Sequence, residues 1–161
     1  MAKNVTIDLS EINTLFNNLD KDSQKNMMMK ALKEGAKYLQ SETQKTLISK
    51  FPKAKTAKGK AKKTMVDGVY IKPQKAYTEV DVSVMGNYLN IFFEGGTKER
   101  YWKIRTKGSN GKTRVSKTSK GKYTGKVDGL NFFQDTRKRE SENTMKIIED
   151  AIGDELKKLN K

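Results

Sequence analysis

Glu94 is the acidic residue whose surroundings in the sequence come closest to those of a catalytic base. It ends the densest apolar run of the chain and precedes Gly95 and Gly96. A carboxylate among apolar side chains can have a raised pKa and accept a proton in a reaction. The competing interpretation is an ion pair with Lys98 or Arg100, and we favour this structural role because a buried acid is more often paired with a cation than catalytic.

Other arrangements of catalytic residues do not assemble in the sequence. Glu79 and Asp81 share one face of an expected strand, but the alternation along that strand turns this face towards solvent. The chain contains no His and no Cys, which removes imidazole bases, thiolate nucleophiles, disulfides and the usual zinc ligands. The lysine-rich stretch 53–63 lacks the Gly-Lys-Ser/Thr of a phosphate-binding loop. The sequence therefore predicts a protein that is not an enzyme and that needs no metal and no cofactor.

Tyr101 and Trp102 lie among Lys and Arg residues, and rings beside cations have two common uses. They stack single-stranded bases, or they anchor a protein interface. The net charge of +15 favours nucleic acid, an acidic protein surface or anionic lipid as a partner, although a lysine-rich surface can also serve solubility alone. No motif for reading a nucleic-acid sequence accompanies the rings, so these alternatives stay open.

The N-terminal third of the chain predicts mostly helix. Residues 5–9 alternate as a short strand, and Ser10 can cap a helix of about three turns. Residues 20–23 break this helix and cap a long amphipathic helix over residues 23–49, which Phe51-Pro52 ends. Of three adjacent methionines, only the middle one faces the expected core, and small residues at 35 and 36 would allow close packing. The expected stripe comprises Met28, Ala31, Leu32, Gly35, Ala36, Leu39, Thr43, Thr46 and Leu47.

The second half of the chain predicts strands and a last helix. Residues 65–73 and 77–85 have the pattern of an antiparallel hairpin. The run 88–93 fits a third strand or a short helix, and its periodicity does not decide between them. The final helix is expected to be capped by Asp135 or Thr136. Its expected apolar stripe comprises Met145, Ile148, Ile152, Leu156 and Leu159.

Two lysine-rich segments, residues 50–64 and 103–128, interrupt this pattern and are expected to be flexible. The order of elements predicts one α+β domain over residues 1–161. A long N-terminal amphipathic helix and a C-terminal helix would pack on a small antiparallel sheet, with a long basic loop inserted before the C-terminal helix. No apolar run reaches the length of a membrane span, and the N-terminus has no apolar signal core. We therefore expect a soluble cytoplasmic protein with no membrane partner.

This ordered set of features resembles a known family. The set comprises the long helix, the basic stretch leading into residues 65–69, the alternating strand 80–84, an aromatic-Glu-x-Gly-Thr motif within residues 92–101 and an aromatic pair within residues 130–137. Over nearly the whole chain it is similar to the gene-ten-like head–tail joining proteins of long-tailed bacteriophages and prophages, also called neck or tail-completion proteins. The long insertion 103–126 departs from the family's pattern.

The resemblance implies a structural protein, with no catalytic residues to carry over. Such a protein forms a ring at the head–tail junction of the virion, as a neck, tail-completion or minor tail component, after assembly in the bacterial host cytoplasm. The implied partners are further copies of itself, connector or portal-side proteins and tail-tube proteins, with non-specific contact to DNA. The alternative is a basic protein that binds nucleic acid without sequence preference. The residues expected to shape the loop base and the assembly surfaces are Phe92, Phe93, Glu94, Gly95, Gly96, Thr97, Lys98, Arg100, Tyr101, Trp102, Arg105, Arg114, Phe132 and Phe133.

Overall fold

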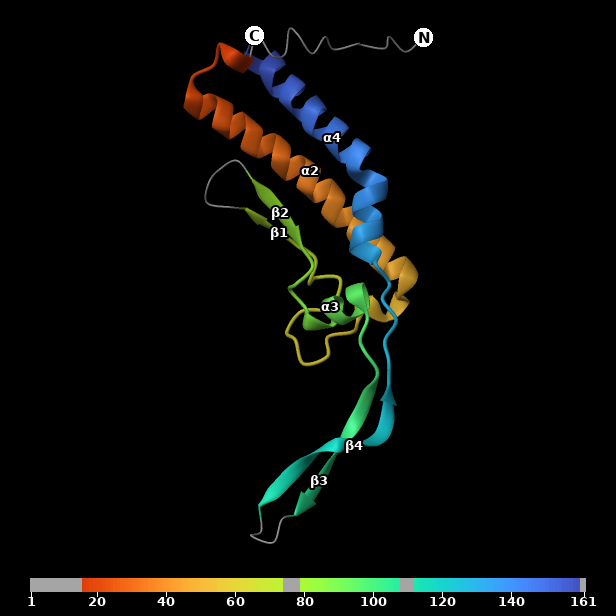
Figure 1. The fold of residues 1–161 in the computed structure, drawn as a ribbon. Helices are drawn as coiled ribbons and strands as arrows, with labels where there is room; N and C mark the ends of the chain where they lie inside the picture. The colour runs from red at the N-terminus through yellow and green to blue at the C-terminus, as the bar shows by residue number, and fades with distance from the viewer. Residues whose placement is uncertain (1–15, 74–78, 108–111, 160–161) are drawn as a thin grey trace.

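Two long helices, one short helix and two β-hairpins are the main elements of the part of the chain that the structure describes (Figure 1). The structure is a computed structural model and describes residues 16–73, 79–107 and 112–159. The strand expected at residues 5–9, most of the helix expected after Ser10 and the turn at 74–76 lie outside the described residues. The arrangement confirms the α+β class, with two separate two-stranded antiparallel sheets.

Helix α2 (Lys21–Lys50) begins and ends where the sequence indicates. The carboxylate of Asp20 caps it by accepting hydrogen bonds from the backbone N–H groups of Asp22 at 3.0 Å and Ser23 at 2.9 Å. These amides lack partners within the helix, so the cap stabilises the first turn. The helix ends at Lys50 with Phe51 as its C-cap, because Pro52 has no N–H to continue it.

Helix α4 (Phe132–Leu159) lies along α2, and the two form the elongated body of the molecule (Figure 1). The two helices pack closely at Gly35, where a Cβ would lie 2.6 Å from Cγ1 of Ile148. This confirms the prediction that a small residue lets α2 pack close to its neighbour, which here is α4.

Two details of the predicted helix stripes are wrong. Met27 and Met29 are buried, whereas Met28 is only half-buried. The buried residues of α2 follow two lines that flank Met28, one through Met27, Ala31 and Gly35 and the other through Met29, Ala36 and Thr43. Met145 in α4 is 56% exposed. The buried side of that helix includes the polar residues Thr136 and Glu140, so a pattern of apolar residues does not identify it.

Strands β1 (Tyr70–Pro73) and β2 (Val80–Ser83) form the predicted antiparallel hairpin, with Ile71 opposite Val82. The hairpin lies against α2, where the side-chain amide of Gln40 donates a hydrogen bond to the carbonyl of Val69 at 2.8 Å. Below it, a cluster of fully buried apolar side chains joins α2, α4 and the loop between α2 and β1. This core comprises Leu47, Ala54, Met65, Val69 and Phe132.

The run whose structure the sequence left open is helix α3 (Tyr88–Gly95). The side-chain oxygen of Asn87 caps it by accepting from the N–H of Leu89 at 2.9 Å, and its amide nitrogen donates to the carbonyl of Lys63 at 2.8 Å. The basic segment 50–64 contains a 3-10 turn, η1 (Pro52–Lys55), and runs as a loop against α3. The N–H of Lys60 donates to the hydroxyl of Tyr88 at 3.1 Å.

The expectation of an irregular insertion after Trp102 is wrong. Strands β3 (Arg100–Lys107) and β4 (Thr113–Gly125) pair as a second antiparallel hairpin, which extends away from the helical body (Figure 1). We call this hairpin, residues 100–125, the basic arm. Where their side chains are described, both strands are mostly exposed, so the segment lacks the alternation of apolar and polar residues by which a half-buried strand is recognised.

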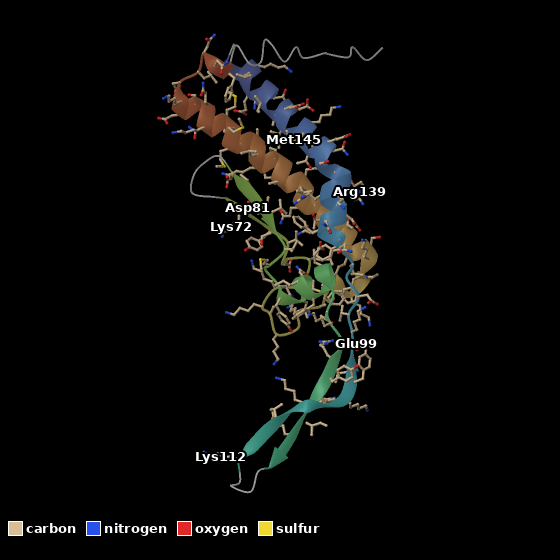
Figure 2. All side chains as sticks on the ribbon, viewed as in Figure 1. Lys72, Asp81, Glu99, Lys112, Arg139 and Met145 are labelled. Carbon is tan, nitrogen blue, oxygen red and sulfur yellow. The ribbon has the colours of Figure 1, made fainter. Side chains whose placement is uncertain are left out.

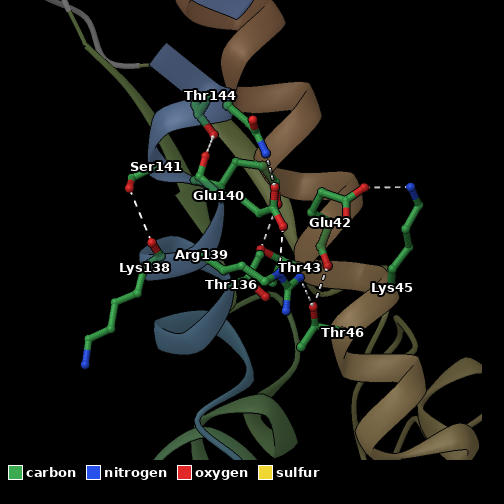
Figure 3. A network of polar contacts seen from close by, with 12 residues as sticks. Glu42, Thr43, Lys45, Thr46, Thr136, Lys138, Arg139, Glu140, Ser141 and Thr144 are labelled. Atoms are coloured by element: carbon green, nitrogen blue, oxygen red, sulfur yellow. Dashed lines mark hydrogen bonds and ion pairs between the residues drawn. The ribbon is translucent and has the colours of Figure 1, made fainter. Parts of the chain in front are cut away.

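A polar network fixes α4 on α2 at Glu140, which is only 7% exposed (Figure 3). Its carboxylate accepts hydrogen bonds from the hydroxyl of Tyr38 at 2.6 Å, Nε of Arg139 at 2.7 Å and the side-chain amide of Asn143 at 3.0 Å. Arg139 also donates to the hydroxyl of Thr46 on α2, at 3.2 Å. These donors, with Tyr38 contributing most, lower the pKa of Glu140 from 4.5 to about 2.

The pKa of Glu140 predicts an acid-dependent loss of stability. Because the folded-state pKa lies below the unfolded value, the network stabilises the fold above about pH 4.5 and loses this contribution as the pH falls towards 2. The Glu140→Gln variant should therefore show a smaller drop in melting temperature than the wild type over this range. Some drop should remain, since Asp20, Asp135 and Glu155 also have lowered pKa values.

Glu142→Gln is the matched control, because Glu142 is exposed and makes no hydrogen bond or ion pair with the described residues. Thermal unfolding followed by circular dichroism at several pH values is the measurement. Identical pH profiles for the wild type and Glu140→Gln would contradict the assignment.

Candidate functional site

The base of the basic arm is a close crossing of two chain segments, which we call the clasp: residues 93–97, and residues 127–134. Backbone hydrogen bonds join them, from Leu130 N–H to the carbonyl of Phe93 at 2.6 Å and from Thr97 N–H to the carbonyl of Val127 at 2.7 Å. The hydroxyl of Thr97 accepts from the N–H of Val127 at 3.0 Å. The clasp thus closes the chain at the point where the arm leaves and returns to the helical body (Figure 1).

Glu94 supplies the cap of α4 from a distant part of the chain. One carboxylate oxygen accepts from the N–H of Phe133 at 2.9 Å, and the other accepts from the N–H of Gln134 at 3.0 Å. The first amides of a helix lack partners within the helix and carry partial positive charge, so a carboxylate is favoured there. The expected ion pair of Glu94 with Lys98 or Arg100 is therefore replaced by two bonds to backbone amides.

The expected caps of α4 are also corrected. The helix begins at Phe132, so Asp135 and Thr136 fall inside its first turns. Asp135 forms an ion pair with Lys50 at the end of α2, and this contact lowers the pKa of Asp135. Thr136 is fully buried, and its hydroxyl donates to the carbonyl of Phe132 at 2.7 Å. Asp135 thus joins α4 to α2, Thr136 hydrogen-bonds within α4, and neither residue caps the helix.

The two glycines of the motif have different roles. Gly96 has φ +73°, and a Cβ there would lie 2.7 Å from the backbone nitrogen of Gly129 and 2.8 Å from the carbonyl oxygen of Val127. A Cβ on Gly95 would meet nothing within 4 Å. Gly96 therefore permits both the turn and the close crossing. Gly129, which sequence reasoning did not single out, faces the same crossing from the other side.

The aromatic residues near the clasp divide between core and surface. Phe132 is fully buried, and Phe93 and Phe133 pack against the core, with the ring of Phe93 4.6 Å from that of Phe51. Only Phe92 is exposed, at 43%. Of the four phenylalanines expected at the loop base or the assembly surfaces, three thus contribute mainly to folding.

The basic arm presents rings and cations on an open surface. Trp102 is 67% exposed, and the rings of Tyr101 and Tyr123 lie 5.3 Å apart across the two strands. The hydroxyl of Tyr101 donates to Glu99 at 2.8 Å, which raises the pKa of Tyr101. Figure 2 shows Glu99 at the base of the arm and Lys112 towards its far end. A shallow groove is lined by Arg100, Tyr101, Trp102, Lys103, Arg105 and Thr124.

The structure thus brings together most of the expected surface residues of the arm and adds apolar ones that were missed. Arg114 lies in β4 opposite Thr106, and Lys98 is exposed between the clasp and the arm. Ile104, Val115 and Tyr123 are also exposed. The isolated large apolar residues of an otherwise polar segment were the signal that could have revealed them.

The described residues contain no cluster of acidic side chains arranged to hold a metal ion. None of their helices is both long and apolar enough to cross a membrane. The chain matches no protein-family model, no curated protein and no solved structure.

The clasp predicts opposite outcomes for two adjacent alanine substitutions. Gly96→Ala should destabilise the fold by about 1–3 kcal/mol, because it places a Cβ at positive φ against backbone atoms. Gly95→Ala should change stability by no more than about 0.5 kcal/mol, since its Cβ enters open space. Urea unfolding of both variants measures the difference, and equal stabilities would contradict the described crossing.

Proposed function

We propose that this protein is a structural component of a bacteriophage or prophage head–tail junction and works by assembling into a ring. The observation that carries the proposal is the basic arm, held on the helical body by a clasp built from the motif that resembles the head–tail joining family. In this proposal the ring lies between the portal-side connector and the tail tube, within the virion.

Exposed apolar groups on the arm support an assembly role. Trp102, Val115 and Tyr123 are 67%, 46% and 50% exposed, although each would gain free energy from burial. Trp, Tyr and Arg are enriched at the energetic centres of protein interfaces. An arm that leaves such groups in solvent is suited to docking on another protein.

The proposal excludes an enzyme built on Glu94. Both of its carboxylate oxygens accept hydrogen bonds from amides of α4, so proton abstraction by this group would compete with the helix cap. The motif at residues 93–97 is therefore assigned to architecture.

Assembly is tested on the purified protein, alone and mixed with connector and tail-tube proteins of the same phage or prophage. Negative-stain images and native mass spectrometry should show rings of defined stoichiometry. Trp102→Ala should weaken association at least about tenfold, as expected for an interface anchor. Met85→Ala is the matched control, because Met85 is also 67% exposed but lies outside the arm. Monomers under all mixing conditions would overturn the proposal.

A second candidate is non-specific nucleic-acid binding, favoured by the cations of the groove together with Trp102. Contacts to several phosphates would make affinity fall steeply with salt. Titration against single-stranded and duplex DNA at two salt concentrations decides it. Submicromolar affinity at physiological salt would support this candidate, and affinity no tighter than micromolar would count against it.

A further inference from the structure

The basic arm has charges that it cannot neutralise itself. No Asp or Glu occurs between residues 100 and 127. Arg100, Lys103 and Arg105 all lie in β3, and like charges this close together repel one another. Among the described residues, Arg100, Lys103 and Arg105 have no acidic partner. An acidic surface from outside the arm would relieve this repulsion.

Such a surface lies on α4. Glu142, Glu149 and Asp150 are exposed and form no ion pair or hydrogen bond with the described residues. The other acids of this stretch are engaged, since Asp154 pairs with Lys157 and Glu155 with Lys30 and Lys158. Residues 142–154 contain a single cation, Lys146. This half of α4 therefore carries negative charge without a partner.

The same face offers an apolar contact. Met145 is 56% exposed and lies three residues after Glu142 and four before Glu149, so all three share one side of the helix. The thioether of a methionine packs well against an aromatic ring. Trp102, exposed among the cations of the arm, is the matching group.

The basic arm and the acidic face of α4 lie far apart within one molecule. Figure 2 shows Met145 and Lys112 towards opposite ends of an elongated molecule, so an arm does not reach its own α4 face. The two surfaces are similar in length. Strand β3 has 8 residues and spans about 27 Å, and the helical residues 142–154 span about 20 Å. Distinct complementary surfaces at the two ends give a head-to-tail contact, which closes into a ring when the rotation allows it.

We propose that the basic arm of one copy docks on the Glu142–Met145–Glu149 face of α4 in the next copy. This inference rests on the proposed ring assembly and names the surfaces that form its interface. Trp102 packs on Met145, and the arginines and lysine of the groove pair with the acids around it.

Charge exchange between the two surfaces tests the contact. One variant carries Arg100→Glu, Lys103→Glu and Arg105→Glu, and a second carries Glu142→Lys, Glu149→Lys and Asp150→Lys. Each alone should associate at least about tenfold more weakly than the wild type. An equimolar mixture should recover association, because each arm then meets an α4 face of opposite charge. The matched control, Asp22→Lys with Glu34→Lys and Glu79→Lys, has the net charge of the second variant and should associate like the wild type.

Sedimentation velocity gives the association, and circular dichroism confirms that each variant is folded. Recovery in the mixture only would establish the contact. If the wild type assembles and the α4 variant assembles equally well, or if the mixture does not recover, the contact is wrong and ring assembly stands. If the wild type stays monomeric with and without its junction partners, both proposals fail.

Discussion

The arrangement of this protein depends on one carboxylate placed at the start of a distant helix. Glu94 lies in the last turn of α3, yet both of its oxygens accept hydrogen bonds from the first amides of α4. The helix needs an acceptor there, and the chain supplies it from a residue 39 positions away from Phe133. The bond therefore fixes where α4 begins and closes the base of the basic arm in the same place.

Glycine makes this closure sterically feasible. The segments on either side of the arm cross at Gly96 and Gly129 at distances that exclude a Cβ on either residue. Past this crossing the arm has a sheet of its own and the helical body has its own core. The protein thus divides into a packed helical body and an exposed arm, and the clasp joins the two.

Local signals in the sequence predict the body well. The Asp20 cap, the extent of α2, the β1–β2 hairpin and the close approach at Gly35 follow from residues adjacent in the chain or at helical spacing. Contacts between residues that are distant in the sequence are harder to predict from it. The buried line of α4 passes through Thr136 and Glu140, which an apolar pattern cannot identify, and the Glu94 cap has no local signature.

The basic arm shows a different limit. The described side chains of its strands are mostly exposed, so the composition of the arm resembles that of an irregular segment. The hydrogen bonds between paired backbones do not affect the hydropathy pattern. The sequence predicts that residues 92–97 shape the base of the loop, and residues 93–97 lie in the clasp. The helix cap and the glycine crossing both involve residues 127–134, which are distant in the sequence. The motif alone therefore does not predict them.

Hydrogen exchange at two amides tests the clasp most directly. The N–H groups of Phe133 and Gln134 lie at a helix N-terminus, where amides without a cap exchange quickly. The account predicts that both are protected in the wild type and lose protection in Glu94→Ala, while amides in the middle of α2 stay protected. Rapid exchange of both amides in the wild type, or protection that survives Glu94→Ala, would contradict it.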